Sequence, residues 1–332
     1  MKKNKVLIVR FSSFGDIVQC SSVVELIRQS LNDSEIHWVT RSEFGNLVGL
    51  NAGINKVFTL QKSEGVLGLI QLAILLRREN YTHVYDAHHN LRSAFLKLML
   101  MTKWHFPNLI VRSKDRIKRI LLFYFGINLF PKPFKGIESY IAPLAKWGFT
   151  PQLEKTTVKW NLAGLNPSWS KKKFITLVPS AAWEMKRWPI AHWKKLVLLL
   201  PNIDIVILGG KEDFFCEEIA AINSSRVTNL AGKLSLIESC DIVNKSTMVV
   251  AADTGLLHVA DVLGIPGISL MGPTAFGFTA SQKIRTLEVN LSCRPCSKDG
   301  RGNCSQAVYQ KCMVDVTPEQ VASAINSTHF FS

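Results

Sequence analysis

Carboxylates and cations in four short segments have the spacing expected of loops that follow buried strands. The first segment is Arg10-Phe11-Ser12-Ser13-Phe14-Gly15-Asp16, whose glycine allows the backbone to approach a ligand closely. Asp16 is a candidate general base, and the alternative interpretation is that it caps the helix that follows. The segment does not read GxGxxG, and GxxxxGK[ST] is absent from the chain, so neither a dinucleotide fingerprint nor a P-loop is predicted.

The second segment is Asp253-Thr254-Gly255-Leu256-Leu257-His258, which precedes a helix predicted to run to about Leu263 and to end at Gly264. Free backbone N–H groups and the positive end of the helix dipole at this point suit a pyrophosphate. His258 falls on the first helical turn, near the same ligand. The alternative interpretation is a helix capped by Asp253, with a His258 that serves only packing.

Two further loops carry charge. Lys186 and Arg187 stand just before a proline suited to the first turn of a helix, where cations can neutralise a diphosphate leaving group. A solvated basic loop is the alternative. In Gly209-Gly210-Lys211-Glu212-Asp213, either acidic residue is a candidate to accept hydrogen bonds from a ribose, and both are also natural residues for a helix start.

The elements that must position these loops alternate between strand and helix. Continuous apolar runs predict strands buried on both faces, and amphipathic stretches between them predict crossover helices of βαβ units. The predicted strands are Val6–Val9, Ile36–Val39, Val57–Leu60, Val84–Tyr85, Phe174–Val178, Ile203–Leu208, Met248–Ala251 and Gly267–Met271. The predicted helices are Ile17–Leu31, Val66–Arg78, Leu91–Met101, Ala191–Leu200, Phe214–Ile222 and Leu234–Asn244.

This alternation breaks once, at about residues 150–172, and a chain of 332 residues suits two domains. We therefore predict an α/β protein with a first doubly wound domain over 1–155, a linker over 156–172 and a second domain over 173–332. A last helix at about 317–327 is a candidate to pack back on the first domain. Ligands bind at the carboxyl ends of parallel strands, which is where all four segments fall.

Net charge is +15 and is uneven: residues 1–160 hold 23 Lys/Arg against 11 Asp/Glu, and residues 161–332 hold 17 against 14. A basic first half suggests an anionic partner, although solubility alone would also explain it. Nucleic acid is disfavoured because no nucleic-acid-binding motif is present. The segments 91–104 and 112–130 combine basic and apolar residues, so they predict either helices that lie on an anionic leaflet or ordinary buried helices.

No apolar run is long enough to cross a bilayer, and Arg10 interrupts the short apolar start, so we expect a cytoplasmic protein. Four of the seven cysteines cluster as Cys293-x2-Cys296-x7-Cys304-x7-Cys312. For a cytoplasmic protein this pattern leaves three interpretations open, namely structural zinc, a redox disulfide and free thiols.

Taken in order, these segments resemble the ADP-heptose:lipopolysaccharide heptosyltransferase family over almost the whole chain. The most specific features are the SSxGD of the first loop, the later DTGLxH and the GPT that follows it. The resemblance implies a GT-B architecture, with two Rossmann-like domains facing each other across a cleft. It also implies metal-independent, inverting transfer from a nucleotide sugar. The cysteine cluster resembles a loop of some relatives, and the loop at Trp183-Glu184-Met185 departs from the family pattern.

Roles follow by position in the resemblance. Asp16 matches the catalytic base. The implied donor contacts are Lys186, Glu212, Asp213, Asp253, Thr254, Gly255, Leu256 and His258. The implied acceptor contacts are Arg10, Ser12, Ser13, Asn90 and Arg92, the last two from the stretch Asp86–Ser93.

The function implied is heptose transfer from ADP-heptose to a lipopolysaccharide inner-core acceptor. The partners implied are the nucleotide sugar, an anionic lipid-linked saccharide and the inner-membrane surface. Two alternatives are another nucleotide sugar serving a different surface glycan and a non-catalytic nucleotide-sugar-binding protein. A Rossmann oxidoreductase is disfavoured because GxGxxG is missing.

Overall fold

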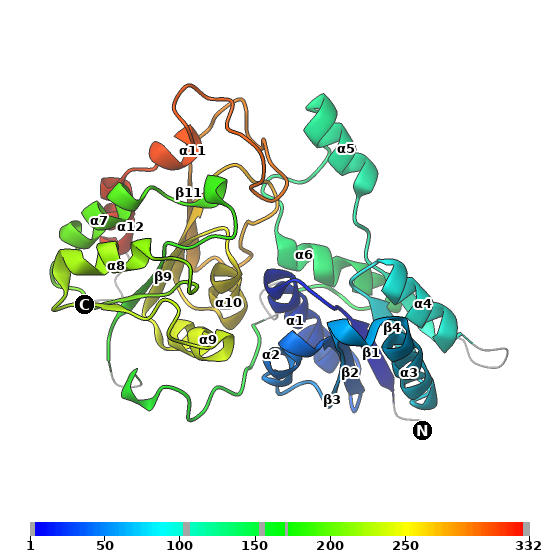
Figure 1. The fold of residues 1–332 in the computed structure, drawn as a ribbon. Helices are drawn as coiled ribbons and strands as arrows, with labels where there is room; N and C mark the ends of the chain where they lie inside the picture. Colours follow the sequence, from blue (N-terminus) through cyan, green and yellow to red (C-terminus); the bar gives the residue numbers. More distant parts are fainter. Residues whose placement is uncertain (1–3, 102–106, 153–156, 170–171, 328–332) are drawn as a thin grey trace. The chain divides into compact units, whose positions relative to one another are not determined.

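The structure is a computed structural model, and it describes residues 4–101, 107–152, 157–169 and 172–327. The chain divides into two compact units (Figure 1). Unit 1 comprises residues 1–115 and 137–162, and unit 2 comprises residues 116–136 and 163–332. The boundary near 162 falls inside the predicted linker, but residues 116–136 cluster with unit 2 where the sequence suggested the first domain.

Unit 1 contains a parallel five-stranded sheet in the order β3-β2-β1-β4-β5. Helices α3 and α4 cover one face, where their apolar residues pack on Val9, Val39 and Val84. Its strands and helices are β1 (Lys5–Val9), α1 (Phe14–Ser30), β2 (Glu35–Arg41), α2 (Gly45–Gly49), β3 (Lys56–Leu60), α3 (Gly65–Arg78), β4 (His83–Asp86), α4 (Leu91–Leu100), β5 (Asn108–Val111) and α6 (Gly136–Ile141).

Unit 2 contains a parallel six-stranded sheet in the order β11-β10-β9-β6-β7-β8. Its strands are β6 (Ile175–Val178), β7 (Ile205–Ile207), β8 (Val227–Asn229), β9 (Met248–Ala252), β10 (Gly267–Met271) and β11 (Ile284–Glu288). Its helices are α5 (Arg116–Phe125), α7 (Ile190–Leu199), α8 (Phe215–Ala220), α9 (Leu236–Lys245), α10 (Gly255–Leu263), α11 (Lys311–Val314) and α12 (Pro318–Asn326).

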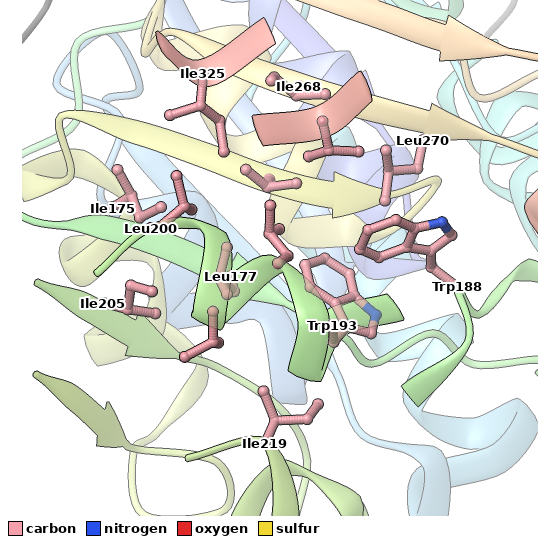
Figure 2. Packing of buried hydrophobic residues seen from close by; sticks show 14 of the residues in the cluster. Ile175, Leu177, Trp188, Trp193, Leu200, Ile205, Ile219, Ile268, Leu270 and Ile325 are labelled. Atoms are coloured by element: carbon pink, nitrogen blue, oxygen red, sulfur yellow. The ribbon is translucent and has the colours of Figure 1, made fainter. Parts of the chain in front are cut away.

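The core of unit 2 lies between its sheet and helices α7, α8 and α12. Figure 2 shows Leu177 and Leu270 of the sheet with Trp188 and Trp193, whose rings meet edge to face with centroids 4.9 Å apart. Helix α12 adds Ile325 to this core, so it packs within unit 2, where the sequence suggested a return to the first domain. Burial of these large side chains is the main favourable term in the free energy of folding of this unit.

The predicted α/β class, with two doubly wound parallel sheets, is confirmed. All eight predicted strands and all six predicted helices are present with small shifts of their ends, and α10 ends at Gly264 in the left-handed conformation, as expected of a helix-terminating glycine. No described helix is both long and apolar enough to cross a bilayer.

Candidate active site

The strand orders place the candidate loops at the switch point of each sheet. In unit 1 the chain reverses direction across the sheet between β1 and β4, where Val9 is paired with Asp86. In unit 2 it reverses between β6 and β9. The loop with Asp16 follows β1, the loop with Lys186 follows β6, and Asp253 follows β9. Ligands of doubly wound folds bind outside the carboxyl ends of strands at such points.

Asp16 occupies the third position of α1, and it both caps the helix and remains partly accessible. Its Oδ2 atom accepts hydrogen bonds from the Ser13 hydroxyl at 2.8 Å and from the Ser13 N–H at 3.3 Å, forming a capping box. The side chain is nevertheless 39% exposed. The two roles considered for this residue are therefore compatible, because one carboxylate oxygen serves the cap and the carboxylate still reaches solvent.

Two side chains besides Ser13 hold Asp16 in place, and a third packs on one of them. The Arg10 Nη2 atom lies 2.5 Å from Asp16 Oδ2, and its Nη1 donates to the Ala87 carbonyl at 2.8 Å. The Tyr140 hydroxyl donates to Asp16 Oδ1 at 2.8 Å. The guanidinium carbon of Arg112 lies 3.9 Å from the centre of the Tyr140 ring. Arg10 and Tyr140 thus approach opposite oxygens of the carboxylate and fix its plane.

This arrangement keeps Asp16 ionised. Burial raises the pKa of Asp16, but attraction to the Arg10 guanidinium lowers it. Hydrogen bonds from Ser13 and Tyr140 lower it further, and the resulting pKa is about 2. At neutral pH the group is a carboxylate that is able to accept a proton.

A cavity of about 290 Å³ opens at the same edge of the unit 1 sheet. Its charged side chains are all basic, and they come from three separate segments of the chain. The lining residues are Phe11, Ser12, Arg41, Leu60, Gln61, Lys62, Gly65, Val66, Leu69, His88 and Arg92. Ser12 and Arg92 were candidate acceptor contacts from the sequence, whereas Arg41 and Lys62 were not. The cavity suits a polar ligand that carries negative charge.

The stretch Asp86–Ser93 is built around a buried carboxylate. Asp86 accepts the N–H groups of His88 and His89 at 3.0 and 2.7 Å, and its other oxygen lies 2.7 Å from Lys97 Nζ. Asn90 caps α4, because its side-chain oxygen accepts the N–H of Ser93 at 2.9 Å. Of the two residues predicted here as acceptor contacts, Arg92 lines the cavity, whereas the side-chain oxygen of Asn90 is used to cap α4.

In unit 2 the corresponding cluster is centred on Lys186 and Asp253. The Lys186 Nζ atom lies 2.9 Å from Asp253 Oδ2, and both side chains are 14% exposed. Lys186 stands between Met185 and Trp188, which are buried. Trp188 is fixed in turn by a 2.8 Å hydrogen bond from its indole N–H to the Val316 carbonyl. The core shown in Figure 2 therefore anchors the loop that presents this lysine.

Three more residues complete the surroundings of Asp253. The Thr274 hydroxyl donates to Asp253 Oδ2 at 2.9 Å, and His258 Nε2 lies 3.5 Å from Oδ1. Gly277 packs so closely that a Cβ atom added there would lie 2.1 Å from Asp253 Cγ. Burial raises the pKa of Asp253, but Lys186 and His258 outweigh it and hold the pKa far below its ordinary value. Asp253 is thus a buried anion that orients the Lys186 ammonium.

Helix α10 begins beside this pair. Its cap is Thr254, whose hydroxyl accepts the N–H of Leu257 at 3.3 Å, so the alternative of a helix capped by Asp253 is not observed. The N–H groups of Gly255 and Leu256 belong to the first turn and have no intrahelical acceptor. These donors and the helix dipole lie directly after Asp253 in the chain, a geometry suited to an anion.

The two acidic residues of the loop after β7 have different surroundings. Asp213 Oδ2 accepts the N–H of Gly210 at 2.7 Å, and its Oδ1 lies 3.6 Å from Arg187 Nη2. Glu212 is exposed. Asp213 thus shapes the loop, and Glu212 is the acidic side chain of the two that remains presented to solvent.

Three of the four clustered cysteines, Cys293, Cys296 and Cys304, lie in a stretch without regular structure between β11 and α11, and the fourth, Cys312, is a buried residue of α11. Burial is the main cause of the raised pKa of Cys296, and the neighbouring thiols of Cys293 and Cys304 raise it further. The thiols are therefore near enough to influence one another. Among the described residues, the one set of three or more His, Cys, Asp or Glu ligand atoms within 4.8 Å of one another is Glu35, His37 and Glu79. Four cysteine thiols, all of them in the described part of the chain, are a donor set that suits zinc, but no three of their sulfur atoms lie within 4.8 Å of one another.

Glu35, His37 and Glu79 belong to an ion-pair network with two lysines. The Lys5 and Lys56 ammonium groups lie 2.8 and 2.7 Å from the carboxylate of Glu79. These residues lie at the amino ends of strands or in the loops before them, away from the edge that carries Asp16.

Besides Arg41 and Lys62 of the cavity, four residues around Asp16 and Asp253 were not predicted from the sequence, namely Tyr140, Arg112, Thr274 and Gly277. Tyr140 and Arg112 carry no local motif, and Tyr140 meets Asp16 across 124 residues of chain. Thr274 and Gly277 did have a signal, since they belong to or follow the GPT that was noted as part of the resemblance.

Known proteins resemble this chain over nearly its full length. The lipopolysaccharide heptosyltransferase 2 of Escherichia coli K12 is 29% identical over 351 residues, covering 97% of this chain and 98% of that protein. The lipooligosaccharide heptosyltransferase 2 of Haemophilus ducreyi is 23% identical over 357 residues, covering 97% and 98%.

Solved structures share the fold. The ADP-heptose lps heptosyltransferase II of E. coli matches with a TM-score of 0.74 and 20% identity, covering 97% of this chain and 98% of that one. The E. coli heptosyltransferase WaaC with ADP matches with a TM-score of 0.70 and 19% identity, covering 97% and 99%. The fold of this chain is therefore that of the GT-B heptosyltransferases.

A family model described as glycosyltransferase family 9 (heptosyltransferase) matches residues 69–309. Its span takes in the basic residue Arg92, the Lys186–Asp253 pair and the start of α10. Because this match covers well over half of the chain, the chain belongs to glycosyltransferase family 9 (heptosyltransferase) and is a glycosyltransferase.

Proposed function

We propose that the protein transfers heptose from ADP-heptose to an inner-core acceptor of lipopolysaccharide, with inversion at the anomeric carbon. The observation that carries this proposal is the Asp16 carboxylate, which Arg10 and Tyr140 hold ionised and partly exposed at the switch point of unit 1. Support for the sugar and the nucleotide comes from the heptosyltransferase relatives and from the ADP complex of the WaaC protein, which has the same fold.

Unit 1 supplies the acceptor side of the proposal. The cavity beside Ser12 presents three cations, Arg41, Lys62 and Arg92. An inner-core acceptor is an anionic, lipid-linked saccharide, so this cavity matches it in charge. Arg10 is buried and engaged with Asp16 and the Ala87 carbonyl, so its role is to position the base.

Unit 2 supplies the donor side. Lys186, oriented by Asp253, and the first-turn N–H groups of α10 provide positive charge for the diphosphate. Glu212 is the proposed ribose contact because Asp213 is engaged in its own loop. We propose that these fixed charges supply the electrostatic stabilisation of the leaving group, so that transfer proceeds without a divalent ion.

The reaction follows from these groups. An acceptor hydroxyl attacks the anomeric carbon as the bond from that carbon to the diphosphate oxygen breaks, and the bonding electrons leave with ADP. The hydroxyl proton passes to Asp16. A carboxylate with a pKa of about 2 is a weak base, but the hydroxyl becomes strongly acidic as its oxygen bonds to carbon, so late proton transfer suits this group. Attack opposite the leaving group inverts the anomeric centre.

The test replaces Asp16 with asparagine. Asp16→Asn should bind ADP like the wild type, seen as an equal thermal shift, and lose about 10²–10⁴-fold in kcat with ADP-heptose and a lipopolysaccharide acceptor. The matched control is Asp33→Asn, an exposed loop residue of the same unit, which should keep full activity. Unchanged turnover of Asp16→Asn would exclude the base. Thermal stabilisation by UDP or GDP in place of ADP would exclude ADP-heptose as the donor.

We also propose that the four cysteines hold a structural zinc ion. What supports this is their donor type and the mutual influence of their thiols. Protein purified without chelator should contain about one equivalent of zinc, and the double variant Cys296→Ser/Cys304→Ser should contain none. Cys216→Ser, a buried cysteine of the same unit, is the control. Wild-type protein with no bound metal would contradict the proposal.

We place the enzyme in the cytoplasm, peripheral to the inner face of the cytoplasmic membrane. A lipid-linked acceptor would be presented there, and the excess of Lys/Arg in the first half of the chain suits an anionic leaflet.

A further inference from the structure

Helix α5, over Arg116–Phe125, has an inner face that is anchored on one aromatic residue of its own unit. The Arg119 guanidinium carbon lies 4.1 Å from the centre of the Phe276 ring, and the rings of Phe123 and Phe276 have centroids 6.0 Å apart. The segment after the helix adds Phe130 and Phe134, whose ring centroids lie 5.0 and 5.1 Å from that of Phe276. One face of the helix is therefore committed to packing.

The outer face of α5 is apolar and exposed. Ile117, Ile120 and Tyr124 are spaced three and four residues apart, so they form one line along the helix. Ile117 is 75% exposed and Tyr124 is 82% exposed. The neighbouring Phe125 is also exposed, as are Ile127 and Leu129 just beyond the helix. We call these six residues the α5 outer face. So many large apolar side chains in one short segment mark an interaction surface.

Basic residues surround the α5 outer face. Residues 116–136, which belong to unit 2, contain five Lys/Arg and no Asp or Glu, a net charge of +5. Arg116 and Lys118 are exposed on the helix itself. A helix with an apolar, aromatic face and basic flanks is the pattern of helices that lie in a membrane interface. Ten residues span only about 15 Å, so the helix is suited to lie in that interface and is too short to cross it.

We infer that the α5 outer face binds the surface of an anionic phospholipid bilayer. The basic flanks favour an anionic bilayer over other partners. A protein partner, or a second copy of this basic chain, would need an acidic surface to match these flanks. An anionic leaflet carries negative charge along the whole segment. Basic residues near such a surface are attracted to its anionic headgroups, and burial of the apolar residues adds to the affinity. The inference extends the proposed function, since a lipid-linked acceptor resides in such a bilayer.

The same helix is linked to the donor cluster inside unit 2. Phe276, which anchors α5, lies between Thr274 and Gly277 in the sequence, and both of these contact Asp253. Lys135, just beyond the α5 segment, also forms a β-bridge with Phe278. The membrane-binding helix and the loop that supports the Asp253–Lys186 pair are therefore packed on one another.

The experiment is flotation of the full-length protein with vesicles of phosphatidylcholine containing 0 or 30% phosphatidylglycerol. Wild-type protein should float with the anionic vesicles, and higher salt should weaken this because it screens the basic flanks. The variant Ile117→Ser/Tyr124→Ser should bind at least about tenfold more weakly, because two large side chains no longer leave water. The matched control is Leu198→Ser/Phe214→Ser, which alters residues 64% and 75% exposed elsewhere in unit 2 and should float like the wild type.

Thermal stability and the shift with ADP are measured for both variants, so that loss of flotation is read only from folded protein. Equal flotation of the α5 variant and the wild type would overturn the inference, as would absence of wild-type binding to anionic vesicles. Self-association that the α5 variant abolishes, without vesicle binding, would assign the face to a second copy and would also overturn it. None of these readouts requires sugar transfer, so failure of the proposed function would be seen separately.

Discussion

Tyr140 donates a 2.8 Å hydrogen bond to Asp16 across 124 residues of chain, on the carboxylate oxygen opposite the one that Arg10 contacts. The tyrosine is itself fixed: it is buried, its carbonyl accepts a 2.7 Å hydrogen bond from the Tyr85 hydroxyl, and the Arg112 guanidinium lies over its ring. The direction in which Asp16 presents its free lone pairs is thus set by residues far from it in sequence.

Tyr140→Phe should raise the pKa of Asp16 from about 2 toward its ordinary value, because a hydrogen bond to the charged form is lost. The acid limb of kcat/KM should then move to higher pH, and kcat should fall by about tenfold, in line with the 1.5–3 kcal/mol of a hydrogen bond to a charged group. Tyr81→Phe, which removes a buried hydroxyl that pairs with His37, is the control and should leave the acid limb in place. An unshifted limb in Tyr140→Phe would show that this hydrogen bond does not tune Asp16.

Lys186→Met should leave the largely buried Asp253 carboxylate without its ion-pair partner, with only Thr274 and His258 beside it, and lower the free energy of unfolding by about 3 kcal/mol at pH 7. The pKa of Asp253 is depressed in the folded protein, so its stabilising contribution is fully present above the unfolded pKa of about 4 and is lost progressively as the pH falls from there toward the lower pKa of the folded state. The difference between wild type and variant should therefore shrink at low pH. Urea unfolding at pH 7 and at pH 3.5 measures it, and an equal difference at both values would contradict the assignment.

Gly277→Ala should damage the donor cluster, because the new Cβ would lie 2.1 Å from Asp253 Cγ and one of the two must move. We expect the thermal shift with ADP to fall sharply. Gly49→Ala is the control, since a Cβ there meets no atom within 4 Å, and it should bind ADP like the wild type. Full ADP binding by Gly277→Ala would mean that the position of Asp253 does not matter for the nucleotide.

Gly300→Ala tests whether the cysteine loop supports Lys186. A Cβ at Gly300 would lie 2.6 Å from Lys186 Cγ and 2.7 Å from its Cδ. Gly302→Ala is a close control because both glycines have positive φ, 93° and 105°, so both alanines carry backbone strain, but only the one at Gly300 strikes another residue. The dissociation constant for ADP, measured by calorimetry, should rise in Gly300→Ala and remain near the wild-type value in Gly302→Ala. Equal effects would show that backbone strain alone is responsible.

The strands that could be predicted from the sequence are more buried than those that could not. The eight strands predicted from the sequence include β6, β9 and β10, whose residues are buried throughout, and β1, which is buried after Lys5. The three that were missed, β5, β8 and β11, are all edge strands and are largely exposed or half-buried. An edge strand has a neighbour on one side only and need not be apolar on both faces. Accordingly β8 and β11 carry no continuous apolar run, whereas β3, the other edge strand of unit 1, does carry one and was predicted.

The sequence by itself determined the class of fold, the loops in which the candidate residues lie and the start and end of α10. These features depend on local patterns, namely apolar runs, turn residues and motifs within a few positions of one another. Only the tertiary structure decided that Tyr140 reaches Asp16, that Asp253 orients Lys186 and does not cap α10, and that residues 116–136 pack with unit 2. Strand order and the burial of side chains bring such partners together, and neither is encoded in the spacing of any one segment.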